Sequence, residues 1–344
     1  MPSPERVRVG VMGTGAMGRV HLTTMLSRDD TEVVAVCEPS PGAYEAAVSE
    51  FAKHGLPAPP NEPDWARFVE RYASDLDVVF IVTPHALHAS QTTACLEAGL
   101  DVFLEKPMVM DAIEAERLIA ARDRTGRLLV VAFPGSLSPT VRTAARMIAS
   151  GEVGSILNIA AVAWQDWDRH TVGTWRQEPA VAGGGFLFDT GAHMLNTVCD
   201  LAGEDVSQVA AWLENDGRAV DIRATVMARL PSGALVTMNA CGRAIPSLGS
   251  DIQVFCERAT LRTGIWGERL EMQRAGKARL APVRSVQRRN VWEQFLAVRA
   301  GLEPNPSPPE VGLRMARLWD GIRASSASGG AVVRLDDPAI AGAA

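Results

Sequence analysis

The sequence predicts an α/β fold: an N-terminal doubly wound parallel sheet, followed by a C-terminal α+β domain with a large, open, mostly antiparallel sheet. Up to residue 133, short apolar runs without polar alternation are separated by helical segments, as strands buried on both faces require. From residue 151, turn signals and alternating strands recur at short intervals instead. We therefore expect domains over residues 1–133 and 134–335, and a flexible tail over 336–344.

The bulk composition is that of an ordinary globular protein of about two domains. A net charge of -6 argues against nucleic acid and anionic membranes as partners. The five cysteines are scattered without a C-x-x-C pair, which indicates free thiols in a reducing compartment. Strand-like sequence begins by residue 7 and no apolar run is long enough to span a bilayer. We expect a soluble, cytoplasmic protein.

The first expected strand, residues 7–12, leads directly into a G-x-G-x-x-G turn and then a helix. In such a turn the first glycine allows the tight bend and the second lets a pyrophosphate approach the backbone. The third lets the helix pack close, so that its N-terminal amides face the phosphates. This arrangement predicts a Rossmann-type dinucleotide site, formed by Gly13, Thr14, Gly15, Ala16, Met17 and Gly18.

The second strand, residues 32–37, ends at Glu38, which follows Gly18 by 20 residues. An acid at this distance is expected to accept hydrogen bonds from both adenosine ribose hydroxyls and to repel a 2′-phosphate. Pro39 and Ser40 supply no arginine for that phosphate, although Arg19 could reach it. We therefore favour NAD over NADP as the cofactor.

The rest of the first domain follows the same alternation. Four prolines between residues 55 and 63 indicate a loop or a damaged edge strand. With this segment counted as an edge strand, we expect six strands by residue 133. A strand over 77–83 ends at Thr83 and Pro84, and His85 and His88 open the next helix. Contacts to the nicotinamide half of the cofactor or helix capping explain these histidines better than metal binding, and we expect no metal. His21 and His54 are interpreted as structural.

A buried strand over residues 102–104 is followed at once by Glu105, Lys106 and Pro107. Ligands of open α/β sheets bind at this carboxyl edge. Pro107 biases Lys106 away from helix, so the charged pair sits on a short, stiff segment. A lysine there can hydrogen-bond a substrate oxygen or assist proton transfer, whereas the alternative is a surface ion pair.

In the second domain, three glycines at 183–185 precede Asp189 and His193. These two residues lie four apart on an expected helix, so a carboxylate would steady a histidine suited to general base catalysis. A helix-terminal Asp and a buried structural His are the alternative. Aromatic and charged residues crowd the approach, and stacking on sugar rings is their candidate function. The substrate-contacting candidates are Trp164, Trp175 and Arg176.

Taken in order, the glycine turn, Thr83-Pro84 with His88, Glu105-Lys-Pro107 and Asp189-x-x-x-His193 resemble the glucose–fructose oxidoreductase / inositol dehydrogenase / rhizopine catabolism (Gfo/Idh/MocA) family. The resemblance covers nearly the whole chain. Residues 133–139 depart from it, because family members often carry an Asn-x-Arg-Phe-like stretch there. His85 stands where Asn is common, and Asn196 where Asp is frequent.

The resemblance implies NAD(P)-dependent oxidation of a hydroxyl on a sugar, inositol or related polyol. It implies that Lys106 binds the reacting hydroxyl, that His193 is the general base or acid, and that Asp189 orients His193 or holds a neighbouring hydroxyl. We expect Thr83, Pro84, His85, His88, Glu105 and Lys106 to contact the cofactor. It also implies a homodimer or homotetramer formed through the C-terminal sheet. Two alternatives stay open: an NAD-retaining glycosidase of the same family, and a non-catalytic dinucleotide sensor.

Overall fold

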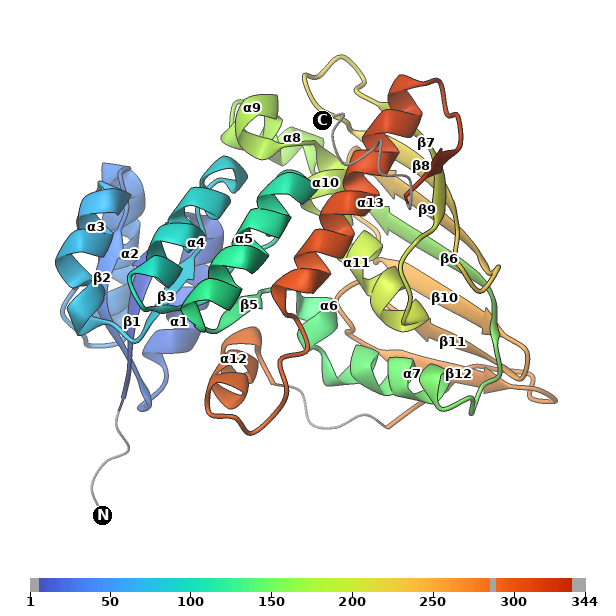
Figure 1. The fold of residues 1–344 in the computed structure, drawn as a ribbon, viewed down its shortest axis with the longest axis horizontal. Helices are drawn as coiled ribbons and strands as arrows, with labels where there is room; N and C mark the ends of the chain where they lie inside the picture. The colour runs from blue at the N-terminus through green and yellow to red at the C-terminus, as the bar shows by residue number, and fades with distance from the viewer. Residues whose placement is uncertain (1–5, 285–288, 336–344) are drawn as a thin grey trace. The chain divides into compact units, whose positions relative to one another are not determined.

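The computed structural model describes residues 6–284 and 289–335, and it divides the chain into two compact units (Figure 1). The first unit comprises Met1–Met108, Glu114–Ala132 and Asn290–Pro309. The second comprises Val109–Ile113, Phe133–Arg289 and Glu310–Ala344. The predicted tail, 336–344, lies outside the described residues.

The first unit contains a five-stranded parallel sheet in the order β2-β1-β3-β4-β5. Its apolar strands are buried, as their sequence predicts. The strands are β1 (Val7–Met12), β2 (Thr31–Cys37), β3 (Val78–Ile81), β4 (Asp101–Leu104) and β5 (Leu129–Val131). The connecting helices are α1 (Ala16–Leu26), α2 (Pro41–Lys53), α3 (Trp65–Tyr72), α4 (His88–Glu97) and α5 (Ala112–Thr125). The predicted parallel fold is confirmed.

The expectation of a sixth strand in this sheet is wrong. Between residues 55 and 63 the described backbone makes one isolated parallel bridge, from Asn61 to Val36. Proline carries no N–H to donate to a ladder, so Pro57, Pro59 and Pro60 prevent this segment from extending the sheet.

A segment from late in the chain completes the core of the first unit. Helix α12 (Val291–Arg299) brings Trp292, which is fully buried, to 6.0 Å from the ring of Phe103, measured between ring centroids. The indole N–H of Trp292 donates to Thr31 Oγ1 at 3.0 Å. The sequence analysis assigned residues 290–309 to the second domain. That assignment is corrected here, because the apolar side chains of α12 fill the space beside β4.

The second unit is built on a nine-stranded sheet in the order β13-β12-β11-β10-β6-β9-β8-β7-β14. Among the described strand pairs of this second sheet, only β6 and β9 are parallel. The strands are β6 (Ile156–Trp164), β7 (Gln208–Glu214), β8 (Arg223–Arg229), β9 (Leu235–Cys241), β10 (Asp251–Cys256), β11 (Ala259–Thr263), β12 (Leu270–Arg274), β13 (Ala281–Pro282) and β14 (Val333–Arg334). This confirms the large, mostly antiparallel sheet, and adds β11, β12 and β13, which the sequence analysis did not identify.

Helices α7 (Pro139–Ala149), α11 (Gly191–Ala202) and α13 (Pro309–Ala327) lie on one side of this sheet (Figure 1). Strand β8 alternates strictly, with Ala224, Val226 and Ala228 buried, and its other side chains, including Met227, exposed. One face of the sheet is therefore packed against helices, while the other carries exposed apolar side chains.

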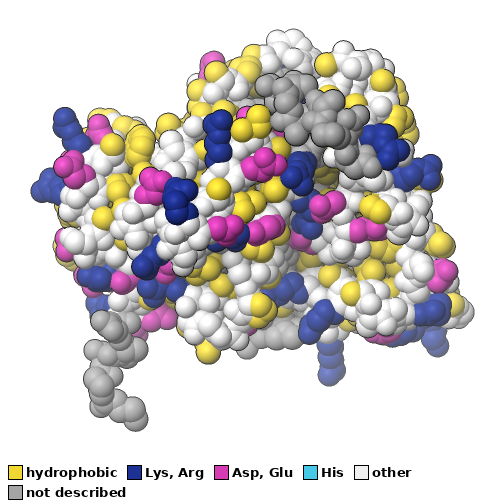
Figure 2. All heavy atoms as spheres, viewed as in Figure 1, with side chains coloured by type: hydrophobic (Ala, Val, Ile, Leu, Met, Phe, Trp, Pro, Cys, Tyr) yellow, Lys and Arg dark blue, Asp and Glu magenta, His cyan; other side chains and the backbone are white. Residues whose placement is uncertain are grey.

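The surface of the described residues shows no large area of one charge on the face in Figure 2, where acidic and basic side chains are interspersed. Among the described helices, none combines the length and the apolar character that crossing a membrane would need.

We expect Trp292→Ala to lower the free energy of unfolding of the first unit by about 3 to 5 kcal/mol, because it removes a buried ring and leaves a cavity. Trp292→Phe keeps the ring but loses the hydrogen bond to Thr31, and should cost about 1 kcal/mol beyond its lost volume. Urea unfolding followed by circular dichroism measures both. Leu302→Ala, at a side chain that is 76% exposed, is the control; an equal effect of all three would contradict the packing role.

Candidate functional site

The glycine turn between β1 and α1 has the shape that a dinucleotide requires. Gly13 has a φ of +93°, and a Cβ there would lie 2.5 Å from the Val82 carbonyl oxygen. A Cβ on Gly18 would overlap the Gly13 carbonyl oxygen, so the helix can pack this closely only without a side chain. A Cβ on Gly15 would meet no heavy atom within 4 Å. The open space at Gly15, at the N-terminus of α1, fits the pyrophosphate of a dinucleotide.

Glu38 lies beside this turn, as predicted. It is 7% exposed, and its two carboxylate oxygens accept from Thr14 N at 2.7 Å and from Ser40 N at 2.8 Å. Carboxylate oxygens can each accept more than one hydrogen bond, so this arrangement is compatible with ribose binding. Arg19 donates to the Thr14 carbonyl at 3.1 Å.

His88 contacts main chain on both sides of its ring. It is fully buried, with Nδ1 2.8 Å from the Pro107 carbonyl oxygen and Nε2 2.9 Å from that of Thr83. Both nitrogens are therefore engaged with main-chain carbonyls of the first unit. Its neighbour His85 is also buried, with the two ring centroids 5.7 Å apart. The hydroxyl of Thr83, the residue before Pro84, donates a hydrogen bond to Gln91 Oε1 at 2.6 Å.

Glu105 and Lys106 follow β4 at the carboxyl edge of the first sheet. Glu105 Oε1 lies 2.8 Å from His21 Nε2, and Oε2 accepts from Lys106 N at 3.0 Å. Burial opposes ionisation of Glu105, but the contact with His21 and the charge and N–H of Lys106 together outweigh it and lower the pKa of the carboxyl. His21, interpreted as structural from the sequence, thus supports the residue next to Lys106. Lys106 itself is half-buried.

Asp189 and His193 lie on two successive helices of the second unit, α10 (Phe186–Asp189) and α11, instead of on one continuous helix. Both are buried. Asp189 Oδ2 accepts from Trp167 Nε1 at 2.9 Å and from Arg176 Nε at 3.2 Å. These two contacts hold the Asp189 carboxylate in place.

The imidazole of His193 lies among aromatic rings of the second unit. Its centroid is 6.4 Å from that of Phe133, at an interplanar angle of 90°, and 5.8 Å from that of Trp266. Sequence reasoning missed Trp266, because it is 73 positions from His193 and belongs to no motif.

Asp221 is a second residue that the sequence analysis missed. It is 5% exposed and accepts from Gly185 N at 2.6 Å and from Leu187 N at 2.9 Å, so it holds the glycine segment before Asp189. A Cβ on Gly185 would overlap the Asp221 backbone. Burial raises the pKa of the Asp221 carboxyl, although the two N–H groups favour its charged form.

The tryptophans of this region lie in different surroundings. Trp164 is 39% exposed at the end of β6 and lines a surface hollow with Trp212 and Thr225, because strand alternation directs it to the face opposite α11. Trp167, three residues later, is the indole that contacts Asp189. Trp175 stacks with the guanidinium of Arg176, at 4.5 Å from the ring centroid.

The segment that carries Trp167 is anchored by Asp168. This buried carboxylate accepts from Arg218 Nε at 2.7 Å and from Arg243 Nη2 at 2.7 Å. Burial opposes ionisation, but the hydrogen bonds from Arg218, Arg243 and Gln177 outweigh it and lower the pKa of Asp168 to about 2.

A polar network holds α11 through the residues that depart from the family resemblance. Ser136, in the 133–139 stretch, donates to Asp200 Oδ2 at 2.5 Å and accepts from Asn196 Nδ2 at 2.8 Å. Arg314 of α13 donates to Asn196 Oδ1 at 3.0 Å and pairs with Asp200 at 2.5 Å. Asn196 is therefore part of the connection between α11 and α13.

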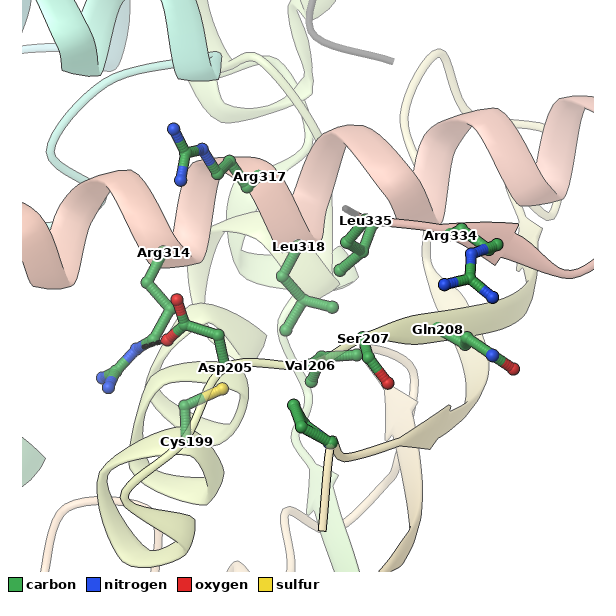
Figure 3. Close-up of a pocket in the computed structure, with 11 residues that line it drawn as sticks. Cys199, Asp205, Val206, Ser207, Gln208, Arg314, Arg317, Leu318, Arg334 and Leu335 are labelled. Carbon is green, nitrogen blue, oxygen red and sulfur yellow. Dashed lines mark ion pairs between the residues drawn. The ribbon is translucent and has the colours of Figure 1, made fainter. Parts of the chain in front are cut away.

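A pocket of about 510 Å³ in the second unit adjoins this network at Arg314 (Figure 3). Its lining includes Cys199, Asp205, Arg314, Arg317 and Arg334, and none of the predicted site residues. The three arginines extend in different directions, so the pocket does not focus positive charge on one point. Within residues 6–284 and 289–335, no cluster of three or more His, Cys, Asp or Glu is arranged to hold a metal ion.

We expect Asp168→Asn to lower the free energy of unfolding of the second unit by about 2 kcal/mol at neutral pH. The folded-state pKa lies below the unfolded one, so this stability is present above the unfolded pKa and is lost as pH falls toward about 2. The difference between wild type and variant should therefore shrink as unfolding is measured from about pH 7 to about pH 3. Glu152→Gln, in an exposed pair with Arg274, is the control; a difference for Asp168→Asn that is independent of pH would contradict this assignment.

Two family profiles match the chain. Residues 7–133 match the oxidoreductase family with an NAD-binding Rossmann fold, and residues 141–262 match the GFO/IDH/MocA C-terminal domain.

The following individual relatives share less than a third of their aligned residues with this chain. A levoglucosan dehydrogenase of Pseudarthrobacter phenanthrenivorans is 28% identical over 212 residues, 58% of this chain and 52% of that protein, so the match spans about half of the relative. The scyllo-inositol 2-dehydrogenase (NADP(+)) IolW of Bacillus subtilis is 26% identical over 280 residues, 79% of this chain and 73% of that protein. A solved levoglucosan dehydrogenase, in complex with NADH and levoglucosan, superposes with a TM-score of 0.81 at 22% identity, covering 97% of this chain and 100% of that one. The chain belongs to the Gfo/Idh/MocA family of oxidoreductases, and its first unit is an NAD-binding Rossmann domain.

Proposed function

We propose that this protein is an NAD(P)-dependent oxidoreductase that transfers a hydride between nicotinamide and a secondary hydroxyl of a sugar, inositol or related polyol. The observation that carries the proposal lies within the first unit. There the turn open at Gly15, the acid Glu38 and the half-buried Lys106 all follow strands of one parallel sheet at their carboxyl ends. Glu38 favours NAD over NADP.

NAD, when bound, supplies the hydride acceptor. Lys106 binds the reacting hydroxyl, and its positive charge stabilises the negative charge that develops on the substrate oxygen. His193 accepts the hydroxyl proton during oxidation and returns it during reduction. Asp189, kept in place by Trp167 and Arg176, accepts a hydrogen bond from a neighbouring hydroxyl.

Substrate recognition would use the same segment of the second unit. Trp175 offers an aromatic face for a sugar ring, and Arg176 lies against it while reaching Asp189. Trp164 is not part of this proposal, because it lies on the opposite face of the sheet. The relatives that act on levoglucosan and scyllo-inositol support a carbohydrate-like substrate.

We also propose that the exposed face of the nine-stranded sheet forms a homo-oligomer interface. Apolar side chains recur along that face, and an exposed apolar patch of this kind is typical of a protein–protein interface. They are Leu157, Trp164, Trp212, Met227, Leu235 and Phe255. A cytoplasmic location fits the five cysteines, all of which are free thiols.

A panel of sugars and polyols, run with NAD and with NADP and followed at 340 nm, tests the reaction. We expect NADH to accumulate with at least one substrate, faster than NADPH does. On that substrate, Lys106→Met and His193→Asn should each lower kcat by about two to four orders of magnitude while the Kd for NADH changes little. Thr143→Val, distant from these residues in the sequence, serves as the control.

Three results would contradict parts of this proposal. Full turnover of both variants would refute the assigned roles. Cleavage of a glycoside without net NADH accumulation would favour the NAD-retaining glycosidase. Tighter binding of NADPH than of NADH would overturn the cofactor preference.

Light scattering at micromolar protein concentration tests the interface. We expect a dimer or tetramer for the wild type, and a smaller species for Met227→Glu combined with Leu235→Glu, since two buried charges at an interface are costly. Leu302→Glu introduces the same charge at an exposed apolar residue of the first unit and should leave the oligomer intact. A wild-type monomer would remove the proposal.

A further inference from the structure

The backbone on both sides of Lys106 is held by histidines of the first unit. Before it, the Lys106 N–H donates to Glu105 Oε2 at 3.0 Å, while Oε1 of the same carboxylate lies 2.8 Å from His21 Nε2. After it, the Pro107 carbonyl oxygen lies 2.8 Å from His88 Nδ1. The segment is therefore fixed at the N–H of Lys106 and at the carbonyl of the next residue, Pro107.

His88 also joins this segment to the neighbouring strand end. Its Nε2 lies 2.9 Å from the carbonyl oxygen of Thr83, which follows β3, the strand paired with β4. A neutral imidazole donates through one nitrogen and an imidazolium through both, so at least one of these carbonyls receives a hydrogen bond in either state. Burial lowers the pKa of His88, while the carbonyls of Pro107 and Thr83 oppose that effect.

The side chain of Lys106 depends on this backbone for its position. A lysine side chain has four flexible carbons, so a fixed main chain narrows the positions that its ammonium can take. The chain contains three lysines, Lys53, Lys106 and Lys277. Lys53 and Lys277 are exposed, and Lys106 is half-buried. Almost all basic side chains of this chain are arginines, and Lys106 is the one lysine of the three that is half-buried.

We propose that His88, together with the His21–Glu105 pair, is a positioning residue for Lys106. These groups hold the backbone from which the Lys106 ammonium reaches the substrate oxygen, and His88 couples that backbone to the Thr83 segment. The inference rests on the proposed function, because it takes the role of Lys106 from it. Neither histidine is assigned a contact with substrate or cofactor.

The contacts of His88 and of the His21–Glu105 pair with the backbone at Lys106 are called the brace below. Competitive acetylation with limiting acetic anhydride tests the brace without any substrate. Peptide mass spectrometry gives the labelling of Lys106 relative to Lys53 and Lys277 in the same molecule. Loss of the brace in His88→Ala should raise the Lys106 to Lys277 ratio by roughly threefold or more, through local opening. His88→Gln, which keeps an amide donor, should restore part of the difference. His54→Ala is the matched control, since His54 also contacts a backbone carbonyl, Glu50 O at 3.0 Å, in the same unit.

Turnover on the substrate found in the panel provides the second readout. We expect kcat of His88→Ala to fall by about tenfold to a hundredfold while the Kd for NADH, followed by tryptophan fluorescence, changes less than about twofold. A labelling ratio for His88→Ala equal to that of His54→Ala would overturn the proposal. If His88→Ala does not fold, the same criterion applies to His88→Gln. A raised ratio with unchanged turnover would leave the brace standing and instead refute the catalytic role of Lys106.

Discussion

A carboxylate removed from water must receive hydrogen bonds from the protein, and this requirement shapes every loop of the candidate site. Glu38 accepts from the glycine turn, Glu105 from the peptide of Lys106, Asp221 from the segment before Asp189, and Asp168 from two arginines. In each case the donors belong to a loop that would otherwise have several conformations. The buried acids therefore determine where the chemically active side chains are presented.

The two units contribute different kinds of group. The first presents an open phosphate turn and a lysine from the ends of parallel strands, and the second presents a histidine framed by Phe133 and Trp266. In the second unit the support comes from side chains: the contacts of Ser136, Asn196 and Arg314 with Asp200 fix α11 against α13. A reaction that needs both groups would thus draw on two separately stabilised scaffolds.

The sequence allowed the parallel strands, the glycine turn and Glu38 to be predicted, because periodicity and short-range spacing determine them. It did not reveal contacts between distant segments, such as Asp221 with Gly185, or the return of Trp292 to the first core. Trp164 was misplaced because strand parity, one residue either way, decides which face a side chain occupies. Nothing in the sequence near His88 shows that both of its ring nitrogens lie against carbonyls of its own chain.

The return of α12 to the first unit has a consequence for biosynthesis. Because Trp292 packs against Phe103, the core of the nucleotide-binding unit lacks a component until α12 has left the ribosome. During translation the second unit must therefore be synthesised as an insertion between two parts of the first. A fragment ending at residue 133 would expose the apolar surface that α12 covers, and would be a substrate for chaperones and proteases.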